Sequence, residues 1–175
     1  EARLEPDVIG YNAAISACAS EETWQQALLV LMELRAVELE PDVVTYCASI
    51  TACEKGRQWQ RAVWLLSEML RSNIGPSVVG YSGAISACDT GGQWQHAVWL
   101  LREMSETKVY PDSISYSAAA NACGRDAQWQ RALWLLCEMC CASLEQDVTS
   151  YNVGISACEK SGMWRQALSM LSELW

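Results

Sequence analysis

The sequence has no long hydrophobic run, no nucleophile elbow, no phosphate-binding loop and no carboxylate cluster. Its longest unbroken apolar stretches, such as Ala27 to Met32, have six residues, far short of the roughly 20 that cross a bilayer. The chain does not open on a basic segment followed by an apolar run, so no signal or targeting segment is visible. We therefore expect no membrane span, no catalysis, no cofactor and no small-molecule substrate.

Positive charge is also scarce, because 12 Lys and Arg residues face 21 Asp and Glu residues and the net charge is −9. Nonspecific affinity for nucleic acid comes mainly from cations that neutralise phosphates, so this balance disfavours a general polyanion binder. The sequence is nevertheless 51% hydrophobic and contains nine tryptophans, a composition that builds a folded core rather than a disordered chain.

Several residue types recur every 35 residues along the chain, without an insertion. Such a period is the signature of a repeat architecture, in which each unit buries its apolar surface against its neighbours. The repeated residues are Tyr11, Tyr46, Tyr81, Tyr116 and Tyr151; Trp24, Trp59, Trp94, Trp129 and Trp164; Ala27, Ala62, Ala97, Ala132 and Ala167; Glu33, Glu68, Glu103, Glu138 and Glu173; and Cys18, Cys53, Cys88, Cys123 and Cys158.

Each 35-residue repeat is predicted to form two amphipathic helices joined by a turn that contains glycine. In the first helix, Tyr46, Ile50 and Cys53 lie on one helical face, and a break at 55–57 follows. Proline then ends each hairpin at Pro41, Pro76 and Pro111, and this proline is missing at Gln146. The second helix carries a further apolar stripe: Trp59, Ala62, Val63, Leu66 and Met69. The predicted fold is all-α, an α-solenoid whose concave face is formed by the first helices.

The remaining tryptophans, cysteines and histidine have structural interpretations. We expect the 35-residue tryptophan series to pack in the core, and Trp64, Trp99 and Trp134 to be partly exposed. The periodic cysteines are predicted to be buried and reduced, because stacked helices lie about 8–10 Å apart, beyond the reach of a disulfide. A CxxC runs from Cys137 to Cys140 with Cys141 beside it, but a zinc site usually needs four ligands, so we expect no metal. His96 is predicted to lie on the surface.

The run 41–46, together with Ile50, Gly56, Ala62 and Met69, resembles the pentatricopeptide repeat. The resemblance covers essentially the whole chain and implies a right-handed superhelix of five helix-turn-helix repeats. The tetratricopeptide repeat, with a different period and its tryptophan in the first helix, is the second interpretation. We expect one array over residues 1–175, cut from a longer one. Its predicted parts are the end of a preceding repeat at 1–7, repeats at 8–42, 43–77, 78–112 and 113–147, and a truncated repeat at 148–175.

Positions within a repeat are counted from its first residue and are called places, so that place 1 of the second repeat is residue 43. The resemblance implies that each repeat reads one base of single-stranded RNA through the residues at its places 5 and 35. Asn12 with Asp42 is associated with uracil, whereas Cys47 with Ser77 departs from the family's pattern. Asn152 alone suggests a pyrimidine. Two pairs resemble those for guanine, namely Ser82 with Asp112 and Ser117 with Asp147. The hypothesis for the bound RNA is U-N-G-G-pyrimidine. As a structural alternative, these polar side chains suit the first turns of helices.

The resemblance also implies a role in RNA binding for two further places of each repeat. Place 2 sandwiches bases between apolar side chains, and Thr149 is a polar departure at that place. Place 13 carries a cation near the RNA backbone, which Ser20 and Thr90 lack. The predicted sandwiching residues are Ile9, Val44, Val79 and Ile114, and the predicted phosphate contacts are Lys55, Arg125 and Lys160.

The resemblance implies sequence-specific RNA binding in organelle RNA processing, stability, editing or translation, in a mitochondrion or chloroplast. The alternative is a protein-interaction scaffold that binds no RNA, and protein partners could in either case use the convex face. Three repeats end in Asp42, Asp112 and Asp147, and we expect a scaffold to have no reason to keep aspartate there.

Overall fold

The computed structural model describes residues 7–75, 77–144 and 148–173, and every regular element within those ranges is an α-helix. The predicted all-α class is thus confirmed. The chain divides into two compact units, residues 1–87 and 88–175, and each unit is described by itself. None of the described helices is both long enough and apolar enough to cross a membrane.

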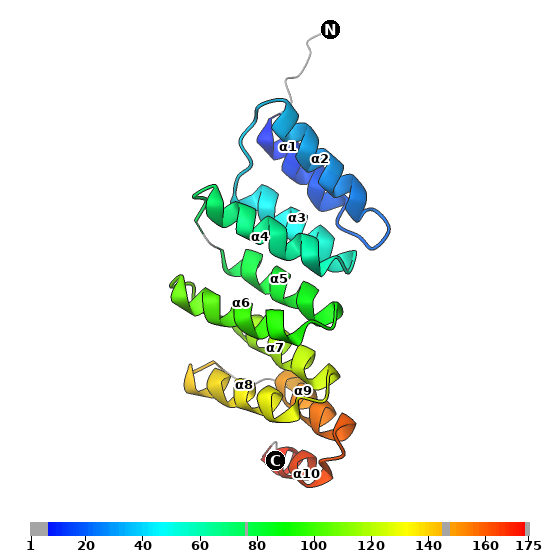
Figure 1. Ribbon diagram of the computed structural model, residues 1–175, viewed down its shortest axis with the longest axis vertical. Coiled ribbons are helices and arrows are strands. Elements are labelled where there is room, and N and C mark those ends of the chain that lie inside the picture. The colour runs from blue at the N-terminus through cyan, green and yellow to red at the C-terminus, as the bar shows by residue number, and fades with distance from the viewer. Residues whose placement is uncertain (1–6, 76, 145–147, 174–175) are drawn as a thin grey trace. The chain divides into compact units, whose positions relative to one another are not determined.

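Unit 1 contains two complete helical hairpins and most of a fifth helix (Figure 1). Helix α1 packs against α2 and α3, and α3 packs in turn against α2 and α4. The bounds are α1 Val8–Ala17, α2 Trp24–Ala36, α3 Val43–Lys55, α4 Trp59–Arg71 and α5 Val78–Thr90, of which the part up to Ala87 belongs to this unit.

Unit 2 begins at Cys88 in the last turn of α5 and repeats the same arrangement. Helix α7 packs against α6, α8 and α9, and α9 packs against α8 and α10. The bounds are α6 Trp94–Glu106, α7 Ser113–Arg125, α8 Trp129–Cys141, α9 Val148–Lys160 and α10 Trp164–Glu173.

The predicted apolar stripes form the core of each unit. Tyr46, Ile50 and Cys53 of α3 are at most 1% exposed, and Ala62 and Met69 of α4 are fully buried. Burying one large apolar side chain contributes roughly 1.5–3 kcal/mol, so adjacent hairpins stabilise one another through these stripes.

The Pro-Asp turns start the first helices by capping them. The carboxylate of Asp42 accepts a hydrogen bond from the backbone N–H of Thr45 at 2.8 Å, and Asp112 accepts one from the N–H of Ser115 at 2.9 Å. Asp7 caps α1 in the same way through the N–H of Gly10. An aspartate at this place therefore satisfies a backbone donor that the helix itself leaves unpaired.

The glycine break differs in detail from the prediction. The residue in the left-handed region is Arg57, with φ 53°, whereas Gly56 has an ordinary φ of −76°. The N–H of Gln58 closes the turn on the carbonyl of Cys53 at 2.8 Å, the Schellman pattern. Gly56 is needed for a different reason: a Cβ there would overlap the ring of Trp24 and lie 2.9 Å from its Cβ.

The periodic tryptophans are less buried than predicted. Trp24, Trp59, Trp94 and Trp129 are half-buried and Trp164 is 61% exposed, so their assignment to the core is wrong. Each is the first residue of a second helix, and for two of them an arginine of the next hairpin covers the ring. The guanidinium of Arg61 lies 4.7 Å from the centre of the Trp24 ring, and Arg131 lies 4.4 Å from that of Trp94.

The predictions for the exposed tryptophans, His96 and four of the five periodic cysteines are confirmed. Trp64, Trp99 and Trp134 are 50–58% exposed, and His96 is exposed. All nine cysteines are free. Cys53, Cys88, Cys123 and Cys158 are buried as predicted, whereas Cys18 is half-buried, and burial raises the pKa of Cys53 to about 11 and of Cys88 to about 12. The thiols of Cys137, Cys140 and Cys141 are exposed on α8, and the described residues contain no cluster that could hold a metal.

Candidate functional site

In the first two repeats the place-5 residue touches the last residue of the same repeat, and in the first repeat that residue caps the next first helix. The amide nitrogen of Asn12 in α1 donates to the Asp42 carboxylate, with distances of 3.1 and 3.3 Å to its two oxygens. The amide oxygen of Asn12 lies 2.6 Å from the hydroxyl of Thr45 in α3. Asn12 is only 8% exposed, so this polar cluster fixes the orientation of its amide.

The Asp42 carboxylate stays ionised in this cluster. Partial burial acts to raise its pKa, but hydrogen bonds from the N–H and hydroxyl of Thr45, from Asn12 and from the N–H of Val44 outweigh it and lower the pKa. The Thr45 hydroxyl has one proton and can donate either to Asn12 at 2.6 Å or to Asp42 at 2.8 Å. The cluster therefore has two alternative hydrogen-bond patterns.

The second repeat makes a weaker version of the same contact. The Cys47 thiol donates to the hydroxyl of Ser77 at 3.6 Å, and burial raises the pKa of Cys47. The Ser77 hydroxyl also accepts from the N–H of Val79 at 3.2 Å. A protonated thiol is a poor hydrogen-bonding group, so this repeat offers less polar recognition than the first.

In unit 2, the hydroxyl of Ser117 in α7 lies 3.4 Å from the hydroxyl of Ser150 in α9. Asp147, the predicted partner of Ser117, lies outside the described residues. Asp112 accepts a hydrogen bond from the hydroxyl of Ser115 at 2.7 Å in addition to capping α7, and Asn152 is exposed on α9. In unit 1, Ser82 donates to the carbonyl of its own helix at Val79, at 3.2 Å.

The predicted sandwiching residues project from the first helices into solvent. Ile9, Val44, Val79 and Ile114 are 56–76% exposed, unusual for large aliphatic side chains, and Thr149 is exposed as well. Between α7 and α9 there is a cavity of about 290 Å³ that brings the side chains of two consecutive repeats together. It is lined by Ser113, Ile114, Ser117, Ala118, Asn121, Thr149 and Val153. An apolar wall and a few hydroxyl and amide groups suit a planar polar ligand.

The predicted phosphate-contacting cations are in different situations. Lys55 and Lys160 are exposed. The Arg125 guanidinium pairs with the buried Asp89 carboxylate, with 3.2 Å between Nε and Oδ1, and Asn121 donates to the other Asp89 oxygen at 2.8 Å. The 3.2 Å contact lacks hydrogen-bond geometry, so it is an ion pair only. Burial raises the pKa of Asp89, although Asn121, Arg125 and Lys160 all act to lower it.

Two groups of site residues were not predicted from the sequence. The first is the place-3 hydroxyl, which links the place-5 residue to the next helix: Thr45 in unit 1 and Ser150 in unit 2. Its signal was available, because Thr45, Ser115 and Ser150 share one place in the 35-residue period. The second is Asp89, whose place holds glutamate, glycine or alanine in the other repeats, so no periodic signal marks it.

The capping geometry also corrects one sequence argument. A scaffold was expected to have no reason to keep aspartate at place 35, but Asp42 and Asp112 cap helices. Substituting such a cap typically costs about 1 kcal/mol, which is reason enough to retain it in any repeat protein. The aspartates alone therefore do not distinguish a scaffold from an RNA-binding array.

Paired helices that recur every 35 residues and stack on their neighbours define a helical-repeat protein. The family profile described as pentatricopeptide repeat domain matches residues 2–55 and 64–126, and that described as PPR repeat matches residues 44–74, 114–144 and 149–175. These matches cover more than half of the sequence. The chain belongs to the pentatricopeptide repeat family.

Solved structures of plant proteins share the fold. The maize pentatricopeptide repeat protein PPR10 matches 98% of this chain and 24% of its own, with 24% identity and a TM-score of 0.77. A structure of PPR10 in complex with an 18-nt psaJ RNA element matches 97% of this chain and 25% of its own, with 20% identity and a TM-score of 0.83. The fold class is thus the α-solenoid.

A third similar structure is the PPR domain of Arabidopsis thaliana protein-only RNase P 1 in complex with tRNA. The match covers 91% of this chain and 84% of the chain in that structure, with 13% identity and a TM-score of 0.78. No curated protein sequence matches the chain. The chain spans about a quarter of the length of PPR10, so likeness to that protein concerns one segment of it.

Proposed function

We propose that the first-helix surface binds single-stranded RNA, with one repeat contacting one base, in the order U-N-G-G-pyrimidine. The observation that carries the proposal is the contact of Asn12 with Asp42, because it joins the two residues that the family uses to read a base. Family membership and the fold shared with RNA-bound PPR10 support it.

The polar cluster leaves Asn12 with groups for a base. Its amide nitrogen has two N–H donors, of which Asp42 takes one, and its amide oxygen has two lone pairs, of which Thr45 takes one. One donor and one acceptor remain, and uracil presents carbonyl acceptors and an N–H donor on its Watson–Crick edge. The fixed amide thus selects a base by complementarity rather than by adapting to it.

Stacking supplies much of the affinity in this proposal. Exposed aliphatic residues such as Val44 and Ile114 lie at the same place on four of the five first helices, so a base can lie between two of them. In the cavity between α7 and α9, Ile114 forms one side and Thr149 the other. Because Thr149 offers less apolar contact than isoleucine or valine, we propose that the last site is the weakest.

In this proposal phosphate contacts contribute little to RNA affinity, which is consistent with the net charge of −9. Lys55 and Lys160 are the exposed predicted cations, whereas Arg125 is already paired with Asp89. Each neutralised phosphate of a single strand steepens the salt dependence by about 0.7 in log–log slope. The proposal therefore implies shallow salt dependence, with a slope of roughly −1 to −2.

We further propose that these repeats act by binding rather than by catalysis. By masking or exposing a transcript they would affect its processing, stability, editing or translation, and the expected compartment is a mitochondrion or chloroplast. The rival function, a protein-interaction scaffold, is equally compatible with the capping role of Asp42 and Asp112, which needs no RNA. Binding of RNA by the purified chain separates the two functions.

The test is fluorescence-polarisation binding of short labelled RNAs to the full chain. An RNA with a U-C-G-G-U core should bind at least about 30-fold more tightly than one with U-C-A-A-U, since two mismatched bases each lose hydrogen bonds worth about 1–3 kcal/mol. Val79→Ala, which shortens an exposed sandwiching residue, should weaken all RNAs to a similar extent. If neither RNA binds above a scrambled control at low salt, the scaffold function replaces the proposal.

A further inference from the structure

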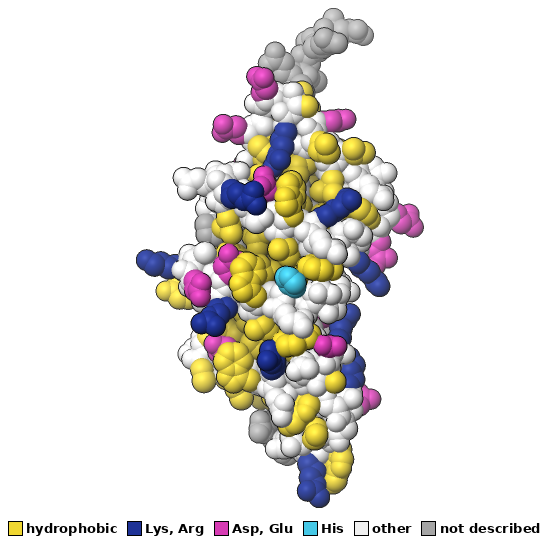
Figure 2. Space-filling view, in the orientation of Figure 1, with side chains coloured by type: hydrophobic (Ala, Val, Ile, Leu, Met, Phe, Trp, Pro, Cys, Tyr) yellow, Lys and Arg dark blue, Asp and Glu magenta, His cyan; other side chains and the backbone are white. Residues whose placement is uncertain are grey.

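The second helices of unit 1 enclose an apolar groove that the RNA proposal does not use. The groove lies between α2 and α4 and has a volume of about 320 Å³. Met32 is 66% exposed and Trp64 50% exposed, and both project from second helices, whereas the reading residues are on first helices. The groove is lined by Leu28, Leu31, Met32, Arg35, Arg61, Trp64 and Leu65. Exposed apolar side chains with arginines on this face are visible in Figure 2.

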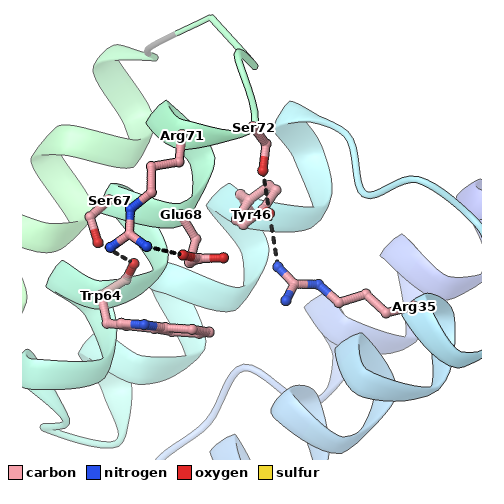
Figure 3. Close-up of polar contacts among 7 residues, drawn as sticks. All are labelled: Arg35, Tyr46, Trp64, Ser67, Glu68, Arg71 and Ser72. Carbon is pink, nitrogen blue, oxygen red and sulfur yellow. Dashed lines mark hydrogen bonds and ion pairs between the residues drawn. The ribbon is translucent and has the colours of Figure 1, made fainter.

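Two arginines give this groove its charge, and both are held in position. Figure 3 shows Arg35 pointing to the hydroxyl of Tyr46, to which it donates at 2.9 Å, with Trp64 projecting from α4. The guanidinium of Arg61 stacks on Trp24. Neither arginine forms an ion pair with any carboxylate among the described residues, and each guanidinium retains free N–H donors.

Unit 2 has a groove at the equivalent places, with different chemistry. It lies between α6 and α8, has a volume of about 380 Å³, and places Trp134 where unit 1 has Trp64. Arg102 replaces the exposed Met32 and pairs with Glu106 at 3.5 Å, and Ser105 replaces Arg35. A carboxylate, Glu138, also lines it. Of the two unpaired cations of the unit 1 groove, unit 2 therefore keeps only the equivalent of Arg61, Arg131 on Trp94, and its additional arginine is neutralised within its own helix.

We propose that the groove between α2 and α4 binds an amphipathic helical segment of a partner protein, one that has an apolar anchor residue with carboxylates beside it. Charge complementarity carries this choice: the groove has an apolar floor and two fixed cations without carboxylates. A helix laid in an apolar groove is a common recognition mode, and tryptophan and arginine are the residues that most often dominate such interfaces. Carboxylates of the partner would pair with Arg35 and Arg61.

RNA is the less suitable occupant of this groove. The same two helices carry Glu33 and Glu68, which repel a continuous polyanion beyond the two arginines, and the predicted base-reading residues are on the first helices instead. A short segment with one or two carboxylates meets only the arginines. The flexible thioether of Met32 also adapts to side chains of different shape.

The test uses two labelled synthetic peptides with identical leucines and one tryptophan on one helical face. One peptide has two glutamates beside the tryptophan and the other has two lysines at the same positions, and all remaining polar positions are uncharged in both. The glutamate peptide should bind the full chain saturably and the lysine peptide should not. Trp64→Ala should weaken binding about 30-fold, whereas Trp134→Ala, its matched control in unit 2, should change it less than about twofold.

Two further variants sharpen the result. Arg35→Ser installs the unit 2 residue and removes one cation, whereas Met32→Ala removes an apolar contact; both positions are exposed, circular dichroism verifies that the fold is kept, and each should weaken the glutamate peptide about tenfold. Absence of saturable binding, equal binding of both peptides, or equal losses for Trp64→Ala and Trp134→Ala would overturn the proposal. Displacement of the peptide by a short oligouridylate, with loss of RNA binding in Trp64→Ala, would make the groove an RNA site instead.

Discussion

Residues 70 positions apart are equivalent in the two units, and the same packing problem has two solutions there. In unit 1 the ring of Trp24 lies so close to Gly56 that a Cβ would overlap it. In unit 2 Asp126 takes the place of Gly56 beside the equivalent Trp94, although an arginine of the next hairpin covers the ring in both units, Arg61 at 4.7 Å and Arg131 at 4.4 Å. The repeat fixes the backbone spacing, while each pair of neighbouring hairpins settles its own side-chain contacts.

The largest expected loss of stability comes from Gly56→Asp, which places the unit 2 residue at the equivalent position of unit 1. Because the new Cβ overlaps the Trp24 ring, we expect a loss of about 2 kcal/mol in unfolding free energy, measured by urea denaturation. Asp126→Gly, the reverse exchange, should change stability by less than about 0.5 kcal/mol. Equal losses in the two variants would contradict the account.

The caps provide the next largest difference. Asp42→Ala removes the cap of α3 and leaves the buried Asn12 amide without its partner, so we expect a loss of about 2 kcal/mol. Asp112→Ala removes the cap of α7 and the bond from Ser115, for about 1 kcal/mol. Thermal unfolding of both variants measures the difference, and a larger loss for Asp112→Ala would be inconsistent with it.

The contribution of Asp42 to the free energy of unfolding depends on pH within a defined range. Its pKa lies below the ordinary value of 3.8, so the folded state favours the ionised form. The stability that this group supplies is fully present above the ordinary pKa and is lost as the pH falls through the lower folded value. The difference between the parent and Asp42→Ala should therefore be constant from neutral pH to about pH 5 and shrink only in stronger acid.

The turns after the first helices give a smaller effect. Arg57 and Ala127 adopt φ of 53° and 56°, whereas Gly92 and Gly162 stand at the same place in other repeats. Since left-handed backbone costs an alanine more than the entropy that glycine adds to the unfolded chain, Ala127→Gly should stabilise by roughly 0.5–1 kcal/mol. Gly92→Ala should destabilise by a similar amount, and a denaturation midpoint that moves the other way would refute the explanation.

The smallest expected effect concerns the paired cation of unit 2, and it rests on the proposed RNA binding. Asp89→Asn removes the carboxylate that holds Arg125 while keeping an oxygen for Asn121. The freed guanidinium should raise RNA affinity about threefold at low salt and steepen the log–log salt dependence by about 0.7. Asp126→Asn, a neighbouring acid without this ion pair, is the control and should leave both quantities unchanged.

The raised pKa of Asp89 also predicts a pH dependence of protein stability, which can be measured without RNA. Burial raises its pKa, so the charged form is penalised in the folded state at neutral pH. This penalty disappears as the pH falls through the raised folded value. The parent should gain stability relative to Asp89→Asn over that range, and parallel pH profiles for the two proteins would contradict the assignment.

The sequence was sufficient for the helices and for the faces that they bury. A strict 35-residue period with tyrosine, isoleucine and cysteine at helical spacing predicts a buried face, and Tyr46, Ile50 and Cys53 are on it. The glycine at 56 marked the right turn, although for a steric reason rather than a conformational one. Local patterns predict local structure because helix geometry fixes which residues share a face.

Contacts between repeats were harder to predict, because they depend on how far one hairpin is shifted against the next. The stripe placed Trp24 on the apolar face but did not reveal that Arg61 covers it from the next hairpin. The pairing of Asp89 with Arg125, 36 residues later, is equally invisible in one repeat. The contact of Asn12 with Asp42 joins two predicted reading residues, whereas the hydroxyl of Thr45 beside them was missed.

The most direct test of the central claim exchanges the reading residues of one repeat from each unit. Parent, Ser117→Asn and Asn12→Ser chains are titrated with RNAs that have U-C-G-G-U, U-C-G-U-U and G-C-G-G-U cores. Modular reading predicts that the parent prefers the first core, Ser117→Asn the second and Asn12→Ser the third, each by about tenfold. If each substitution instead weakens all three RNAs alike, or changes none of them, these residues do not read bases and the account is wrong.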